Sequence, residues 1–234
     1  MRSPVAPDGV QALFNRIAPV YDQLNDGLSL GLHRVWKLMT VQWSGAMPGA
    51  TCLDVCCGSG DVTQLLAQQV GPNGRVVGVD FAASQLAIAQ QRNDQRRSPL
   101  PITWVEGDAL HLPFDDSTFD AATMSYGLRN VASIPDSLRE LHRVLKPGAT
   151  VAILDFHRPS SDLVRQFQRW YLATVVVPMA KDLGMEDEYA YLAPSIDRFP
   201  IGAEQRAIAH QVGFRQAIHY AIAGGLMGVL VATR

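Results

Sequence analysis

Residues 53 to 61 read Leu53-Asp54-Val55-Cys56-Cys57-Gly58-Ser59-Gly60-Asp61, an apolar run that ends in a glycine-rich turn. The run predicts a buried strand over residues 52–56, and the apolar periodicity of residues 62–70 predicts a helix directly after the turn. Two glycines leave no Cβ between the backbone and a ligand, and the first helical turn offers free N–H groups. The stretch therefore predicts a ligand-binding loop at the carboxyl end of a strand in an α/β sheet.

Strand-like and helix-like segments alternate on both sides of this loop. Such alternation is typical of βαβ units and a mainly parallel sheet. After Phe156 the alternation breaks, and about fifty residues pass before two final apolar runs that surround a Gly-Gly turn. We therefore predict an α/β fold: a Rossmann-like, seven-stranded sheet, mainly parallel, with a C-terminal antiparallel hairpin. The predicted strands are 52–56, 75–80, 102–105, 121–126, 150–156, 214–221 and 226–232, and the predicted helices of the core are 62–70, 84–92 and 134–145.

The length of 234 residues fits one large domain with additions. We expect an N-terminal cap over residues 8–45, a cofactor-binding core over 51–156, an insertion on the acceptor side over 157–205, and a closing helix and hairpin over 206–234. The cap and the insertion each carry an apolar stripe at helical spacing. The two stripes, which could close over the carboxyl edge of the sheet, are Val10, Leu13, Phe14, Ile17 and Tyr21, and Leu163, Phe167, Trp170, Tyr171 and Thr174.

Composition argues against several classes of protein. Lys and Arg number 20 against 22 Asp and Glu, which gives a net charge of −2 and argues against a nucleic-acid partner. The start MRSPVAPDGV has no apolar segment, so we expect no signal peptide. Residues 220–233 are too short and too rich in glycine to span a bilayer as a helix. These features predict a cytoplasmic protein.

The three cysteines, Cys52, Cys56 and Cys57, lie within six residues, so no distant partner for a disulfide exists. Two of them are adjacent and no histidine lies nearby, which argues against zinc. We expect no metal, and we interpret the cysteines as small residues packed beside a cofactor.

The spacing around the loop favours S-adenosylmethionine over a dinucleotide. Asp80 lies twenty residues after Gly60, at the end of an apolar strand, where a carboxylate can accept both ribose hydroxyls of a nucleoside. A dinucleotide fingerprint needs a third glycine at position 63, where this sequence has Thr63. A nicotinamide-dependent oxidoreductase and a non-catalytic cofactor-binding module remain the alternatives from other classes.

At these residues the sequence resembles the class I S-adenosylmethionine-dependent methyltransferases, whose first motif is an acid followed by glycines at alternate positions. Cys56 departs from that motif but is small enough to fit. Residues 106–109 resemble the acidic turn that binds adenine in this class, and residues 143–148 resemble its turn before the fifth strand.

Two further segments, residues 21–37 and 125–131, resemble signatures of the ubiquinone/menaquinone C-methyltransferase family, and residues 189–200 resemble its third signature. Residues 56–61 and 195–200 are most similar to the cyanobacterial and plastid branch, which methylates demethylphylloquinone, a 2-phytyl-1,4-naphthoquinone. The resemblance thus implies C-methylation of the reduced ring, with S-adenosylhomocysteine as the second product. Demethylmenaquinone and ubiquinone precursors are the nearest alternative acceptors.

The resemblance also implies which residues contact the cofactor. These are Asp54, Gly58, Ser59, Gly60, Asp80, Phe81, Asp108, Ala109 and Ser125. Arg129 and Asn130 follow the fourth strand on the acceptor side. We hypothesise that Arg129 stabilises the developing phenolate and that Asn130 orients it. The alternative is that Arg129 pairs with a local acid and holds the loop.

Three other residues are candidates on the acceptor side: His33 and Asp22 in the cap as acceptors of the phenolic proton, and Tyr191 in the insertion as a hydrogen-bond partner of the quinol. Each could equally be structural. A phytyl tail comes from a membrane, so the aromatic stripe of the insertion, with Arg165 and Arg169 beside it, predicts either contact with a bilayer, inner or thylakoid, or packing over the sheet. The oligomeric state is left open between a monomer and a homodimer.

Overall fold

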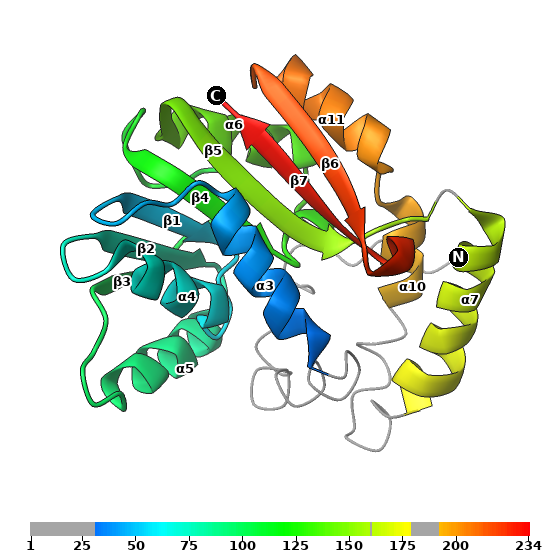
Figure 1. The fold of residues 1–234 in the computed structure, drawn as a ribbon, viewed down its shortest axis with the longest axis horizontal. Helices are drawn as coiled ribbons and strands as arrows, with labels where there is room; N and C mark the ends of the chain where they lie inside the picture. The colour runs from blue at the N-terminus through cyan, green and yellow to red at the C-terminus, as the bar shows by residue number, and fades with distance from the viewer. Residues whose placement is uncertain (1–30, 160, 179–191) are drawn as a thin grey trace.

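The computed structural model describes residues 31–159, 161–178 and 192–234. A seven-stranded sheet in the order β3-β2-β1-β4-β5-β7-β6 forms its centre (Figure 1). The strands β1 to β5 pair in parallel, whereas β7 is antiparallel to both β5 and β6. Their bounds are β1 Thr51–Val55, β2 Arg75–Asp80, β3 Ile102–Glu106, β4 Phe119–Ser125, β5 Leu145–Phe156, β6 Gln216–Ile222 and β7 Met227–Thr233. The predicted sheet and its antiparallel hairpin are confirmed.

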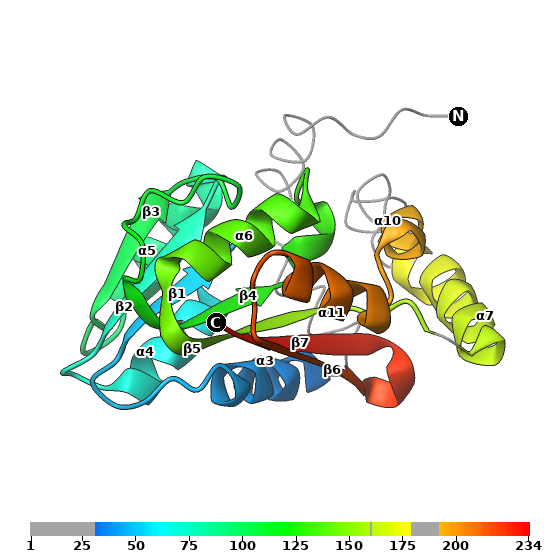
Figure 2. The same cartoon turned by 90° about the horizontal axis from the view of Figure 1, so that it is seen from above.

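Helices cover both faces of this sheet. Figure 2 shows α3 and α4 on one face and α6 and α11 on the other. The α-helices are α3 Leu32–Trp43, α4 Asp61–Val70, α5 Ala83–Asp94, α6 Ile134–Val144, α7 Asp162–Tyr171, α10 Leu192–Arg198 and α11 Gly202–Gln211. Three short helical segments complete the described chain: η1 Leu128–Asn130, the π-helical η2 Leu172–Val176 and η3 Ala223–Gly225. We expected the insertion to end at residue 205 and the closing helix to begin at residue 206. The helix α11 spans both positions.

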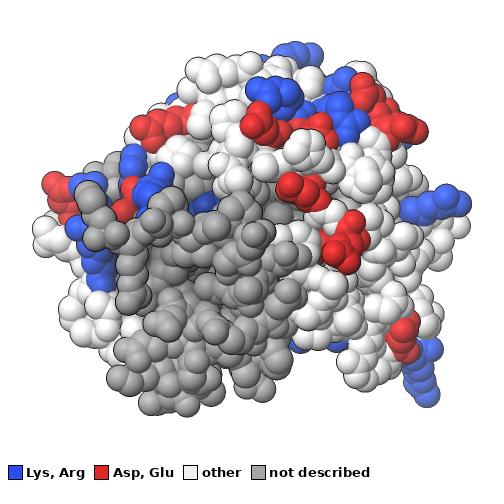
Figure 3. Space-filling view, turned by 180° about the vertical axis from the view of Figure 1, so that it is seen from behind, with Lys and Arg blue, Asp and Glu red and all other residues white. Residues whose placement is uncertain are grey.

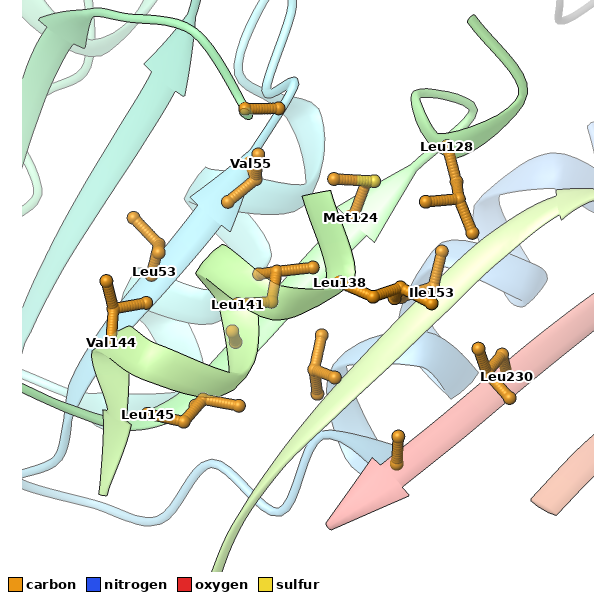
Figure 4. Close-up of a cluster of buried hydrophobic side chains, with 14 of the residues drawn as sticks. Leu53, Val55, Met124, Leu128, Leu138, Leu141, Val144, Leu145, Ile153 and Leu230 are labelled. Carbon is orange, nitrogen blue, oxygen red and sulfur yellow. The ribbon is translucent and has the colours of Figure 1, made fainter. Parts of the chain in front are cut away.

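The larger hydrophobic core lies between α6 and the middle of the sheet (Figure 4). Leu138 and Leu141 of α6 are fully buried against Leu53, Met124 and other apolar side chains of β1, β4, β5 and β7. A second cluster joins α3 and α4 to the opposite face. The parallel strands β1, β2, β4 and β5 are therefore largely buried on both sides, which accounts for their nearly continuous apolar sequences, whereas the edge strand β3 is partly exposed.

One predicted turn has a different form in the structure. Residues 146–148 lie inside β5, where the pairing jumps from Phe119↔Leu145 to Ala121↔Thr150. The extra residues form a bulge, and Gly148 takes a φ of +82° within it. The Lys-Pro-Gly signal thus marks a bulge in the strand.

Beyond the tip of β5, α7 and α10 lie together at one end of the sheet (Figures 1 and 2). The predicted helix of the insertion is thereby confirmed, and it continues as η2. The apolar stripe of the cap, residues 10–21, falls outside the described residues. No helix in the described ranges is long and apolar enough to cross a bilayer. Figure 3 shows acidic and basic side chains intermixed on the described part of one face.

Candidate functional site

The glycine-rich loop joins the end of β1 to the start of α4 in an unusual backbone conformation. Cys56, Gly58 and Gly60 take positive φ values of 56°, 53° and 87°. A Cβ on Gly60 would lie 2.6 Å from the indole of Trp104 and 3.0 Å from the Cβ of Ala89. Position 60 therefore requires glycine for both its conformation and its close packing. Ser59, between the two glycines, is buried.

Asp54 fixes the base of this loop. Its two carboxylate oxygens accept hydrogen bonds of 2.7 Å from the hydroxyls of Thr63 on α4 and Thr123 on β4. Burial raises the pKa of Asp54 to about 7, although the two hydroxyls act in the opposite direction. This geometry explains why position 63 is threonine, and it assigns Asp54 to holding the loop between strand and helix. Direct contact between Asp54 and a cofactor stays a prediction.

Asp80, at the end of β2, connects the loop to the next helix. Its Oδ2 accepts a hydrogen bond of 2.8 Å from the N–H of Gly58, and its Oδ1 accepts one of 2.9 Å from the N–H of Ala82. Burial raises the pKa of Asp80, and the backbone donors, including that of Phe81, oppose the rise. A carboxylate has about four acceptor sites, so Asp80 keeps some capacity for a ligand hydroxyl beside these backbone donors. The site thus holds a preorganised acceptor beside the loop.

The loops after β3 and β4 complete the carboxyl edge. Asp108 is largely exposed and its Oδ1 accepts a hydrogen bond from the N–H of Leu110, whereas Ala109 is buried. Ser125 ends β4, and its buried hydroxyl has no hydrogen-bond partner among the described residues. A buried hydroxyl without a partner is costly, so a ligand group beside Ser125 would stabilise the site.

Arg129 is buried in a salt bridge on the acceptor side of this edge. Its Nη1 donates to Oδ1 of Asp155, its Nε donates to Ser195 Oγ at 2.9 Å, and its guanidinium lies 5.0 Å from the ring centroid of Phe156. The paired side chains are 7% and 4% exposed. The positive charge is therefore already neutralised, and the structure favours the alternative that Arg129 holds the loop over the hypothesis that it stabilises a phenolate.

Of the other predicted catalytic residues, the structure describes Asn130 and His33. Asn130 donates from Nδ2 to the carbonyl oxygen of Tyr126 at 3.1 Å, so it fixes the turn after β4. His33 is buried on α3, close enough to Asp61 to lower the pKa of that carboxyl. Asp22 and Tyr191 lie outside the described residues.

Sequence reasoning missed three residues of this region. Asp155 and Ser195 bind Arg129, and the buried Lys37 forms an ion pair with the half-exposed Asp61. An acid at the end of a buried apolar strand was a signal for Asp155, as it was for Asp80. Ser195 and Lys37 lie in the segments that resemble the family signatures, but nothing in their sequence context singled out either residue.

The hydrogen-bonding groups at the carboxyl edge of the sheet suit a nucleoside that carries an amino-acid tail. The loop supplies backbone groups, Asp80 supplies a carboxylate acceptor for hydroxyls, and the Ser125 hydroxyl lacks a partner within the described part of the chain. In the described ranges, no group of three His, Cys, Asp or Glu side chains is placed to bind a metal ion.

Comparison with known proteins adds independent information. A profile of the ubiE/COQ5 methyltransferase family matches residues 3–234. The 2-phytyl-1,4-naphtoquinone methyltransferase of Nostoc punctiforme is 62% identical over 226 residues, which cover 96% of this chain and 98% of that protein. The chloroplastic 2-phytyl-1,4-beta-naphthoquinone methyltransferase of Arabidopsis thaliana is 51% identical, over 95% of this chain and 86% of that protein.

Solved structures agree on the fold. An S-adenosylmethionine-dependent methyltransferase from Thermotoga maritima superposes with a TM-score of 0.65 at 18% identity, covering 95% of this chain and 98% of that chain. A second such enzyme, from Aquifex aeolicus, has a TM-score of 0.62 at 20% identity and covers 84% of this chain and 88% of its own.

Proposed function

The chain belongs to the ubiE/COQ5 methyltransferase family, and from this we propose that it transfers a methyl group from S-adenosylmethionine to the open ring carbon of reduced 2-phytyl-1,4-naphthoquinone. The product is the ring-methylated phylloquinol of vitamin K1 biosynthesis, together with S-adenosylhomocysteine. The choice of substrate rests on one observation. Cyanobacterial and plant relatives that are named as methyltransferases of this naphthoquinone are 51–62% identical to the chain over nearly its whole length.

The carboxyl edge of the sheet provides the cofactor site in this proposal. Asp80 receives the ribose hydroxyls, Asp108 and Ala109 flank the adenine, and the Ser125 hydroxyl gains a hydrogen-bond partner. The loop from Gly58 to Gly60 brings backbone groups close to the amino-acid part. When bound, S-adenosylmethionine supplies an electrophilic methyl group on a sulfonium. The protein groups bind and orient it, and a dry pocket avoids solvating the charge that is lost on transfer.

The acceptor must be the reduced ring. A quinone is electron-poor, whereas an ionised quinol carries electron density on the carbon next to its oxygen, and that carbon can attack the methyl group. In-line transfer needs the two carbons about 3–3.5 Å apart, so catalysis is largely positioning. We assign the Arg129–Asp155 pair, with Ser195, to holding η1 and α10 in place around the acceptor. His33 and Asp22 remain the predicted proton acceptors, and Tyr191 remains a predicted hydrogen-bond partner of the quinol.

Replacing Asp80 by asparagine tests the ribose contact. The substitution keeps the side-chain shape but removes the charge, and an amide can accept from only one of the two backbone donors. Loss of charge-assisted hydrogen bonds worth about 1.5–3 kcal/mol is expected to weaken S-adenosylhomocysteine binding by roughly 10- to 150-fold in calorimetry.

The matched control is Asp120→Asn. Asp120 also accepts a hydrogen bond from a backbone N–H, that of Thr51, but it lies at the amino ends of the parallel strands, away from the loop. This variant should bind the cofactor like the wild type. If the Asp80 variant bound S-adenosylhomocysteine as tightly as the wild type, Asp80 would not contact the ribose.

The helix α7 provides the contact with the membrane that holds the phytyl tail, in this proposal. Leu163, Phe167 and Trp170 are 78%, 51% and 57% exposed, so they do not pack over the sheet. The two arginines beside them are paired, Arg165 with Asp162 and Arg169 with Asp197. Binding therefore depends on burial of apolar surface in the interface rather than on anionic lipids.

Flotation with phosphatidylcholine vesicles measures this contact. Trp170→Ser is expected to reduce the vesicle-bound fraction several-fold, because it removes a large exposed aromatic side chain. Met47→Ser, at a 66% exposed apolar residue between α3 and β1, serves as the control and should float like the wild type. Equal recovery of the Trp170 variant would exclude α7 as the membrane contact.

Product analysis tests the function itself. The protein is incubated with methyl-labelled S-adenosylmethionine and a panel of reduced phytyl- and polyprenyl-quinones, each also supplied in oxidised form. Label is expected in the ring of the reduced phytyl-naphthoquinone. Preferential labelling of a polyprenyl-naphthoquinol or of a ubiquinone precursor would replace the proposed acceptor, and labelling of oxidised quinones would overturn the requirement for reduction.

A further inference from the structure

Lys37 is a buried cation beside the glycine-rich loop. It lies on α3, and its side chain is 8% exposed. Its Nζ donates to Oδ2 of Asp61 at 2.7 Å, and Asp61 is the first residue of α4, directly after Gly60. The ammonium group is thus held at the point where the loop becomes a helix.

The charges around this point are unbalanced toward the acidic side. Asp54, Asp61 and Asp80 surround the loop, and Asp54 and Asp80 are buried. Lys37 acts on two of the three. Burial raises the pKa of Asp54, and the Lys37 charge weakly opposes that rise. At Asp61 burial acts in the same direction, but the charge and hydrogen bond of Lys37, with the charges of neighbouring basic groups, outweigh it and hold the pKa below its ordinary value. Arg92 approaches Asp61 at 3.4 Å from the outer side, and its side chain is 36% exposed. Lys37 is therefore the cation that lies deepest beside the loop among the described residues.

An ammonium group has three N–H donors. Among the described residues, Lys37 gives a hydrogen bond to Asp61 alone. The second buried cation of the region, Arg129, is already bound by Asp155 and Ser195. A ligand with a carboxylate near the loop would therefore find its free donors on Lys37.

The proposed cofactor carries such a group, since its methionine part is a zwitterion with one ammonium and one carboxylate. We propose that Lys37 binds the α-carboxylate of S-adenosylmethionine and that Asp61 holds the Lys37 side chain in position for this. The inference rests on the proposed function, because it assumes this cofactor. It gives α3 a role in cofactor recognition in addition to its packing against α4.

Calorimetry with two ligands isolates the contact. S-Adenosylmethionine and its decarboxylated form differ only in the carboxylate. Lys37→Met is expected to weaken binding of S-adenosylmethionine by about 10- to 100-fold, as for loss of a charge-assisted hydrogen bond, and to leave binding of the decarboxylated form within about twofold. Lys37→Arg should restore most of the preference for the carboxylate. Arg34→Met, which removes an exposed cation from the same helix, should leave both affinities unchanged.

A purely structural role for Lys37 gives a different result. If the ion pair only joins α3 to α4, both ligands lose affinity equally in the Lys37→Met variant, and this outcome overturns the inference. Unchanged affinity for S-adenosylmethionine overturns it as well. Failure of the proposed function would be visible separately: a wild type that binds neither ligand would exclude the cofactor, and a wrong acceptor would appear in the product analysis alone. Thermal unfolding of each variant shows that the comparison is made between folded proteins.

Discussion

Replacing Arg129 by alanine is expected to lower the free energy of unfolding by about 3–5 kcal/mol. The substitution leaves the carboxylate of Asp155, which is 3% exposed, without its cationic partner. Burial already raises the pKa of Asp155, and Arg129 opposes that rise. Without the arginine, the folded state favours the protonated acid, so the loss of stability should be larger at pH 8 than near pH 4.

Chemical denaturation at both pH values measures this effect. The control is Arg139→Ala, which breaks the exposed pair of Arg139 and Asp136 and should cost less than about 1 kcal/mol. A second change, Asp155→Asn, should recover much of the stability of the Arg129 variant. If the Arg129 variant were as stable as the Arg139 variant, the buried pair would not hold the acceptor side together. Loss of turnover with full stability would instead restore the catalytic hypothesis.

Replacing Gly60 by alanine is expected to cost roughly 2–4 kcal/mol and to weaken cofactor binding. Alanine in a left-handed conformation costs about 1 kcal/mol, and a Cβ 2.6 Å from Trp104 adds the cost of overpacking, about 1–3 kcal/mol. Relief requires movement of the indole or of the loop, and movement of the loop shifts the backbone groups that approach the cofactor.

Gly224→Ala separates the two contributions. Gly224 has nearly the same backbone angles, φ 66° and ψ 17° against φ 87° and ψ 14°, but nothing lies within 4 Å of the position that a Cβ would take there. Its substitution should cost about 1 kcal/mol. Equal losses of unfolding free energy in the two variants would show that Trp104 gives way freely and that only conformation requires glycine at position 60.

The centre of the sheet could be predicted from sequence because its strands are buried on both faces. Burial makes the runs at β1, β2 and β4 nearly continuous in apolar residues, and glycines or prolines separate them from the helices. The Lys-Pro-Gly segment at residues 146–148 was assigned wrongly in detail, since a turn and a bulge in a strand use the same residues. Only pairing with β4 distinguishes them.

The placement of the predicted cofactor residues at one edge of the sheet could be predicted because these residues follow parallel strands. Asp80 and Ser125 lie at strand ends, so their meeting at one edge follows from parallel topology. The state of Arg129 could not be predicted, because its partners Asp155 and Ser195 are 26 and 66 residues away. A sequence shows that an arginine is present but does not show whether its charge is already paired.

The protonation of the two cysteines in the glycine-rich loop affects whether they react with the oxidised form of the substrate. Burial and the neighbouring acids, Asp80 and Asp54 foremost, raise the pKa values of the Cys56 and Cys57 thiols well above the ordinary range. Both are therefore almost wholly protonated at neutral pH and are poor nucleophiles. Thiolates add to an oxidised naphthoquinone, which is electron-poor, at the same open ring carbon that the quinol offers for methylation, and the sulfur is thereby arylated. An enzyme that handles this acceptor is thus protected from arylation of its own loop.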